Sequence, residues 1–162
     1  MLKYLYKIKK EVKTNMIYLA GCCSKEKRNF MKKIAKHLRN NGEEVYCPFE
    51  FKITDVDPWS LTQEDWSKRV FEADVEAINK ADIVIFISEG RLSTAGTNWE
   101  QGYAYALNKK IYVLQHIGEE TSLMTYGGCT KFKNTNKRNI YKDIDEMLYT
   151  DVVYTKCKTH LT

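Results

Sequence analysis

Two carboxylic acids, Glu100 and Asp74, occupy places in the chain where nucleophilic or acid–base chemistry is expected. Glu100 follows an apolar run at 82–88 and a polar loop that contains Gly90 and Gly96. The run is short and rich in β-branched residues, which is typical of a strand buried on both faces of a parallel sheet. Ligands of such sheets bind outside the carboxyl ends of the strands. A carboxylate there, beside backbone amides that favour anions, can act as a nucleophile or a base.

Asp74 lies on the apolar stripe of an expected helix over 62–80. An unpaired charge on a buried stripe is costly, so this carboxyl needs a partner or a function. Either Asp74 faces a cleft, or the helix is rotated so that the carboxyl meets solvent or a neighbouring basic side chain. The stripe is expected to contain Trp66, Val70, Phe71, Ala77, Ile78 and Ala81.

Glu100 also has a purely structural interpretation. Thr97 and Glu100 have the spacing of a capping box, in which Thr97 caps an amide of the first turn and Glu100 bonds back to the start of the helix. The helix would then begin near Thr97, with Glu100 in its first turn. On spacing alone, the capping box explains Glu100 better than catalysis does.

Alternating strand and helix patterns predict the frame that holds these residues. Strands are expected at 16–21, 44–47, 82–88 and 110–115, and helices over 24–40, 62–80, from 97 onward and over 140–148. The predicted fold class is α/β, a flavodoxin-like three-layer sandwich with a parallel four- or five-stranded sheet. A loop is expected at 49–62, which could wall or cover a pocket, and the segment 118–136 is polar and contains glycines. The tail after Thr150 could add an edge strand or dock on a partner subunit.

Composition limits the class of protein. The 162 residues fit a single domain over 16–162 with a basic extension over 1–15. That extension carries +4 of the net charge of +5, so the domain offers no electrostatic case for nucleic-acid binding. No apolar run reaches the length of a membrane span, and no signal peptide is recognisable. Five cysteines without C-x-x-C spacing indicate reduced thiols in the cytoplasm, and the three histidines show no metal spacing, so no metal or cofactor is expected.

Four segments together resemble the nucleoside 2-deoxyribosyltransferase family. They are Tyr-Leu-Ala-Gly at 18–21, Asp74 eight residues before Asp-Ile-Val-Ile, Ala-Gly-Thr-Asn-Trp-Glu-Gln-Gly-Tyr-Ala at 95–104, and Ser-Leu-Met-Thr-Tyr-Gly at 122–127. The resemblance covers most of 16–132. The Gly-Thr-x-x-Glu turn is weak by itself, because other nucleotide-binding α/β proteins have it, and becomes specific when it is joined to the upstream tyrosine and aspartate.

The resemblance implies exchange of nucleobases at the anomeric carbon of a 2′-deoxynucleoside. Glu100 matches the family's nucleophile, which forms a covalent deoxyribosyl ester before a second base or water takes the sugar. Asp74 matches the acid that manages the proton of the leaving base, and Tyr18 matches the tyrosine that holds the nucleophile. A carboxylate suits an oxocarbenium-like transition state, and a protonated base leaves more readily. The partners implied are a small-molecule nucleoside or nucleotide and a free nucleobase.

Further residues are expected to bind the substrate: Gly21, Ser24, Thr94, Gly96, Ser122, Met124, Trp66 and Phe71. Trp66 and Phe71 would stack on the base or enclose it, although core packing explains Phe71 at least as well. Ser122 would act across a subunit boundary, so the resemblance implies a homodimer or a higher homo-oligomer.

Two positions depart from the family's pattern. Thr94 stands where many transferases have an aspartate, and Ser122 stands where many have an asparagine that contacts the 5′-hydroxyl. Hydroxyl residues at both positions resemble a related group, the 2′-deoxynucleoside 5′-monophosphate N-hydrolases, whose serines bind the phosphate. Ser24, Lys25 and Arg28 at a helix amino-terminus could add a phosphate cradle, although they do not form the Gly- and Arg-rich loop of those hydrolases. Deoxyribosyl transfer is therefore expected first, with monophosphate hydrolysis and non-catalytic nucleotide binding as the alternatives.

Overall fold

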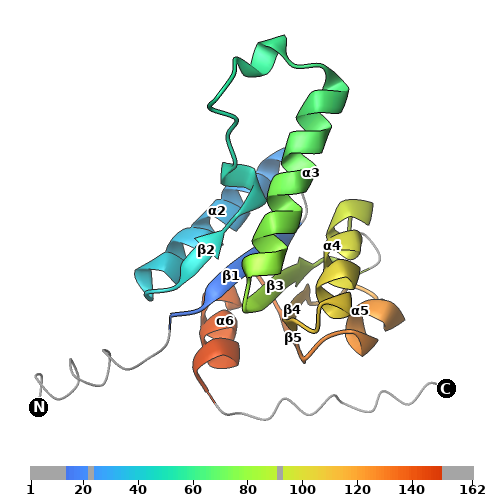
Figure 1. The fold of residues 1–162 in the computed structure, drawn as a ribbon. Coiled ribbons are helices and arrows are strands. Elements are labelled where there is room, and N and C mark those ends of the chain that lie inside the picture. The colour runs from blue at the N-terminus through green and yellow to red at the C-terminus, as the bar shows by residue number, and fades with distance from the viewer. Residues whose placement is uncertain (1–13, 22–23, 91–92, 151–162) are drawn as a thin grey trace, which may run out of the picture.

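The centre of the molecule is one parallel sheet with the strand order β2-β1-β3-β4-β5 (Figure 1). The computed structural model describes residues 14–21, 24–90 and 93–150. The strands are β1 (Met16–Gly21), β2 (Glu44–Tyr46), β3 (Ile83–Ser88), β4 (Lys110–His116) and β5 (Lys131–Thr135). This order is that of flavodoxin-like folds, in which the winding of the chain reverses between β1 and β3. The predicted fold class is confirmed.

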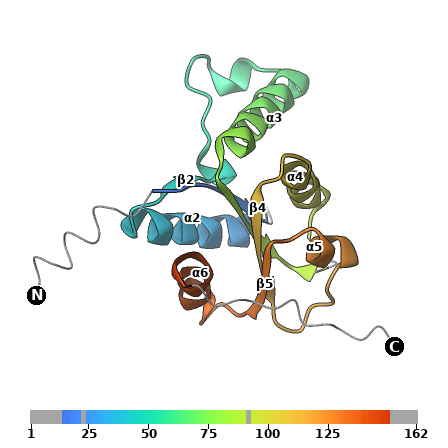
Figure 2. The same cartoon turned by 60° about the horizontal axis from the view of Figure 1, so that its bottom comes forward.

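Helices cover both faces of the sheet (Figure 2). Helices α2 (Lys25–Asn40) and α6 (Ile140–Tyr149) pack on one face, and α3 (Gln63–Lys80) and α4 (Ala95–Ala106) pack on the other. The short helix α5 (Leu123–Gly127) lies beside α4, where the side-chain amide of Gln101 donates to the carbonyl of Thr125 over 2.9 Å. Within the described ranges, no helix is long and apolar enough to cross a membrane.

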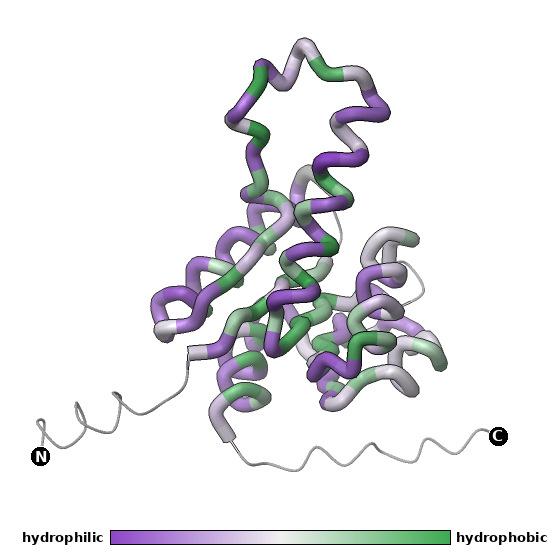
Figure 3. Tube along the Cα trace, viewed as in Figure 1, coloured by the Kyte–Doolittle hydropathy of each residue, from purple (hydrophilic) through white to green (hydrophobic). Residues whose placement is uncertain are grey.

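Alternation along each strand decides which layer a side chain enters. In β1, Ile17 and Leu19 join the core beneath α2 and α6, whereas Tyr18 and Ala20 face α3 and α4. Both faces are covered, so the middle of each inner strand is mostly apolar, and Figure 3 shows these strands in the hydrophobic centre of the chain. Tyr18 is fully buried in this centre, and its phenol therefore needs a hydrogen-bond partner.

The fifth strand lies in a segment that the sequence analysis describes only as polar and glycine-containing. Residues 118–136 contain both α5 and β5, and β5 pairs with β4 at the edge of the sheet. Its sequence, Lys-Phe-Lys-Asn-Thr, is mostly polar because only one of its five residues is fully buried. An edge strand of this kind lacks the apolar run by which the inner strands are recognised. The alternative edge strand, in the tail after Thr150, lies outside the described residues, as do residues 1–13 of the extension predicted over 1–15.

The amino-terminal half of α3 is not part of the core, which corrects the expected apolar stripe. Ala77, Ile78 and Ala81 are buried as predicted, but Trp66 and Phe71 are 49% and 53% exposed. Figure 1 shows this half of α3 projecting beyond the sheet together with the segment before it. That segment, predicted as a loop over 49–62, is irregular except for two short 3-10 helices, η1 (Pro48–Glu50) and η2 (Pro58–Ser60).

Candidate active site

Helix α4 begins one turn earlier than the capping-box interpretation requires. Thr94 is its N-cap, and the hydroxyl of Thr94 accepts a hydrogen bond from the amide of Thr97 over 3.4 Å. Thr97 is already helical and buried, and its hydroxyl donates to the carbonyl of Gly21 over 3.1 Å. Glu100 therefore lies in the second turn, where no amide needs capping. The capping-box interpretation of Thr97 and Glu100 is wrong.

The carboxylate of Glu100 is bound by Tyr18 instead. The Tyr18 phenol donates to Oε1 of Glu100 over 2.8 Å, which joins β1 to α4 across 82 residues of sequence. Burial and the charge of Glu100 raise the pKa of Tyr18 far above its usual range, so this phenol stays protonated and remains a donor. One carboxylate oxygen is thus held in place, which leaves the other available for a ligand.

The environment of Glu100 makes its carboxyl a weaker acid than usual. Burial is the main cause, and the nearby charge of Asp74 adds to it, whereas the hydrogen bond from Tyr18 acts in the opposite direction. Together these effects raise the pKa of Glu100 from 4.5 to about 7. A large fraction of the carboxyl is therefore ionised at neutral pH, yet poorly solvated, which is the condition for a reactive carboxylate.

Asp74 has a tyrosine partner of its own, which sequence reasoning missed. The Tyr46 phenol donates to Oδ1 of Asp74 over 2.9 Å. Tyr46 and Tyr18 are register partners on the neighbouring strands β2 and β1, and their rings stack with centroids 5.6 Å apart. Burial raises the pKa of Asp74, and the bond from Tyr46 lowers it in part. The only sequence signal for Tyr46 was its place near the carboxyl end of the strand predicted at 44–47, one residue before Cys47.

Three further predicted residues, Gly21, Gly96 and Ser24, lie at the end of β1 and at the starts of α4 and α2. Gly21 ends β1, and a Cβ added there would lie 2.4 Å from the terminal methyl carbon of Met31. Gly96 is in the first turn of α4, with open space where a Cβ would be. Ser24 is at the N-cap position of α2, as predicted, but its side chain makes no capping hydrogen bond. Residues 22–23 and the side chain of Lys25 lie outside what the structure describes.

An aromatic row joins α3 to α4. Phe71 contacts Trp99 with ring centroids 5.3 Å apart, and Trp99 stacks on Tyr103 at 5.2 Å. Phe71 and Trp99 are each about half exposed, so they present flat apolar surface to solvent. The sequence pattern did not identify Trp99 as a site residue, because its contact with Phe71 depends on how α3 packs on α4.

Ser122 and Met124 lie on the other side of α4. Ser122 is the N-cap of α5, where its hydroxyl accepts from the amide of Thr125 over 3.4 Å, and Met124 is 85% exposed. Both line a cavity of about 520 Å³, whose α4 wall is Asn98, Gln101, Gly102 and Tyr105. Neither Glu100 nor Asp74 lines this cavity. Within one chain, Ser122 and Met124 therefore do not share a cavity with the predicted catalytic carboxyls.

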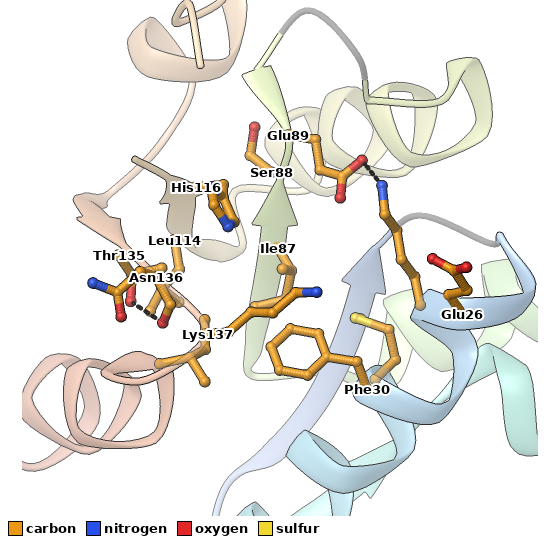
Figure 4. Close-up of a pocket in the computed structure, with 13 residues that line it drawn as sticks. Glu26, Phe30, Ile87, Ser88, Glu89, Leu114, His116, Thr135, Asn136 and Lys137 are labelled. Atoms are coloured by element: carbon orange, nitrogen blue, oxygen red, sulfur yellow. Dashed lines mark hydrogen bonds and ion pairs between the residues drawn. The ribbon is translucent and has the colours of Figure 1, made fainter. Parts of the chain in front are cut away.

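A second cavity lies on the opposite face of the sheet from Tyr18 (Figure 4). It has a volume of about 90 Å³, with apolar walls that include Phe30, Ile87 and Leu114, and an ion pair between Lys27 and Glu89 at its rim. None of the predicted site residues lines it. We therefore place the candidate active site where Glu100, Asp74 and their two tyrosines meet. Among the residues that the structure describes, no group of three or more His, Cys, Asp or Glu side chains could hold a metal ion.

Comparison with known proteins identifies the family and the fold of the chain. Residues 17–139 match the family model for nucleoside 2-deoxyribosyltransferase. The chain is 28% identical to the solved 2-deoxyribosyltransferase of Bacillus psychrosaccharolyticus, with a TM-score of 0.65 over 77% of this chain and 89% of that one. The fold is also shared with the CMP N-glycosidase of Clostridium botulinum, at 20% identity and a TM-score of 0.60 over 82% of this chain and 98% of that one. No curated protein sequence matches the chain.

Proposed function

Because this chain belongs to the nucleoside 2-deoxyribosyltransferase family, we propose that it cleaves the N-glycosidic bond of 2′-deoxynucleosides and transfers the deoxyribosyl group to another nucleobase. The observation that carries the proposal is the partly buried carboxyl of Glu100, which is held by Tyr18 and whose pKa is raised to about 7 beside Asp74. Two carboxyls with different environments can divide nucleophilic and acid–base work between them.

In the first step, the free oxygen of Glu100 attacks C1′ of the sugar. A C1′–O ester bond forms as the C1′–N bond breaks, and the base leaves with the bonding electron pair. Asp74, whose pKa is raised by burial, gives its proton to a nitrogen of the departing base. Tyr18 keeps Glu100 oriented throughout by its hydrogen bond to Oε1.

The second step reverses the first with another base. A ring nitrogen of the incoming base attacks C1′, the ester bond breaks, and Glu100 recovers its negative charge. Asp74, now a carboxylate, accepts the proton that the incoming nitrogen loses. Water in place of the base would yield free deoxyribose, so transfer and hydrolysis differ only in the acceptor.

Hydrolysis of 2′-deoxynucleoside 5′-monophosphates is the second candidate. Its support is the pair of hydroxyl residues at the amino ends of two helices, Thr94 at α4 and Ser122 at α5. The amino-terminus of a helix such as α4 favours a bound phosphate. The hydroxyl of Thr94 is already engaged with Thr97, over 2.7 Å between the two oxygens, which reduces its capacity for a phosphate. Transfer from the free nucleoside therefore stays first, and nucleotide binding without turnover is the third possibility.

One pair of incubations separates these functions. We expect the protein to form deoxyadenosine from deoxyinosine and adenine, with products followed by chromatography. Release of free base and deoxyribose 5-phosphate from deoxynucleoside monophosphates, without transfer, would replace the first proposal by the second. Binding of either substrate class by calorimetry, with no product from either, would leave only the non-catalytic function.

We propose further that the active unit is a homodimer or higher homo-oligomer, in which Ser122 and Met124 reach the site of a second copy. Two observations support this proposal: Met124 is exposed, and the cavity that it lines does not include Glu100 of the same chain. Sedimentation should therefore find no active monomer. Mixing inactive Glu100→Gln with inactive Ser122→Arg should restore activity, because a mixed dimer contains one intact site.

The matched control is a mixture of Glu100→Gln with Asp74→Asn. Both residues belong to the same chain's site, so no intact site can form and activity should not return. If the mixture of Glu100→Gln with Ser122→Arg also stays inactive, or if a monomer turns over substrate fully, the proposed role of Ser122 is contradicted.

A further inference from the structure

We propose that Tyr46 is a positioning residue of the reaction, which holds the carboxyl of Asp74 toward the leaving base as Tyr18 holds Glu100 toward the sugar. The inference rests on the proposed function. It assigns to the end of β2 a part in the acid–base step, in addition to the parts of β1, α3 and α4.

The two tyrosine–carboxyl pairs are built in the same way. Tyr18 and Tyr46 are register partners on adjacent parallel strands, so their side chains leave the sheet on the same face, toward α3 and α4. Their rings lie 15° from parallel. Each phenol then reaches a carboxyl on a different helix, over 2.8 Å to Glu100 and 2.9 Å to Asp74. The sheet thereby sets the relative positions of two groups that are carried by separate helices.

Asp74 needs such a support more than most aspartates do. Its carboxyl is partly buried on α3, and the terminal torsion of an aspartate side chain is broad and poorly fixed by rotamer preference alone. A hydrogen bond to Oδ1 removes that freedom and leaves Oδ2 to carry the proton. Helix α3 is buried against the sheet only from about Ala77 onward. The packing of the helix therefore holds Asp74 less tightly than it holds Ile78.

Removal of the Tyr46 hydroxyl should change the titration of Asp74. The groups that face Asp74 are Tyr46 from β2, Tyr18 from β1 and Glu100 from α4. The bond from Tyr46 lowers the pKa of Asp74, so the pKa rises further when the bond is lost. Asp74 would then keep its proton to higher pH, and the alkaline limb of the rate profile would move upward.

The test is Tyr46→Phe, which retains the ring and its stacking and removes only the hydroxyl. We expect kcat to fall about 10- to 100-fold with little change in KM, since a misplaced general acid loses part of its typical contribution. The loss should be smaller on a substrate whose base leaves readily without a proton. Suitable pairs are 2′-deoxyuridine with its 5-fluoro analogue, and 2′-deoxyadenosine with its 2-fluoro analogue.

Tyr18→Phe is the matched control, because it acts on the nucleophile and should slow both members of each pair equally. The pKa of Asp74, followed by carbon NMR of its carboxyl, should rise in Tyr46→Phe and gives a measurement that does not depend on turnover. If the wild type turns over substrate while Tyr46→Phe keeps its kcat, its pH profile and the pKa of Asp74, the inference is overturned. Absence of all turnover by the wild type would instead refute the proposed function.

Discussion

Glu100→Gln is expected to reduce the rate of N-glycosidic cleavage on the order of 10⁴-fold, as loss of a covalent nucleophile does in other enzymes. Glutamine preserves the size of the side chain, and its carbonyl oxygen can still accept the hydrogen bond from Tyr18. Only the negative charge and the nucleophilic oxygen are lost. The measurement is kcat/KM for the deoxynucleoside that the wild type accepts, at a pH above 7, where the wild-type carboxyl is ionised.

The matched control for this loss is Glu64→Gln, an exposed glutamate in the first turn of α3. It changes the net charge equally and should leave the rate unchanged. Mass spectrometry of the quenched wild-type reaction should also find deoxyribose attached to the peptide that contains Glu100. Activity within a few fold of wild type in Glu100→Gln would mean that another group attacks C1′, and that the bond from Tyr18 serves only to join β1 to α4.

The same substitution should make the protein more stable in alkaline solution. The pKa of Glu100 is raised on folding, so the neutral carboxyl favours the folded state at pH values below 4.5, and this contribution is lost as the pH rises through about 7. A pKa difference of this size corresponds to roughly 3 kcal/mol. Because glutamine never ionises, Glu100→Gln avoids the loss, and its free energy of unfolding should exceed that of wild type by about this amount at pH 8.

Urea denaturation at a series of pH values measures this difference. We expect the gap between Glu100→Gln and wild type to open between pH 4.5 and 8, at a fixed protein concentration so that any subunit association affects both proteins equally. Glu64→Gln should show no such pH-dependent gap. A gap that is constant with pH would show that Glu100 is well solvated in the folded protein. A stabilising loss of function is the usual sign of a site that is strained for its reaction.

Much of the frame followed from the sequence, since local patterns are enough to recognise its parts. The apolar runs of β1, β3 and β4 can only be strands covered on both sides, and these were predicted within about one residue. The turn at 40–42 ended α2 as expected, at Asn40. The family resemblance singled out Tyr18, Asp74 and Glu100, which come from segments far apart in the chain.

The tertiary structure decided how these groups are paired. Spacing alone assigned Glu100 to a capping box with Thr97, because a local pattern cannot include a donor 82 residues away. The pairing of Tyr46 with Asp74 depends on the register of β1 with β2 and on the packing of α3, neither of which has a local signal. For the same reason the polar strand β5 and the exposure of Trp66 and Phe71 were missed. Sequence determined which side chains could react, and the contacts between distant elements determined their partners.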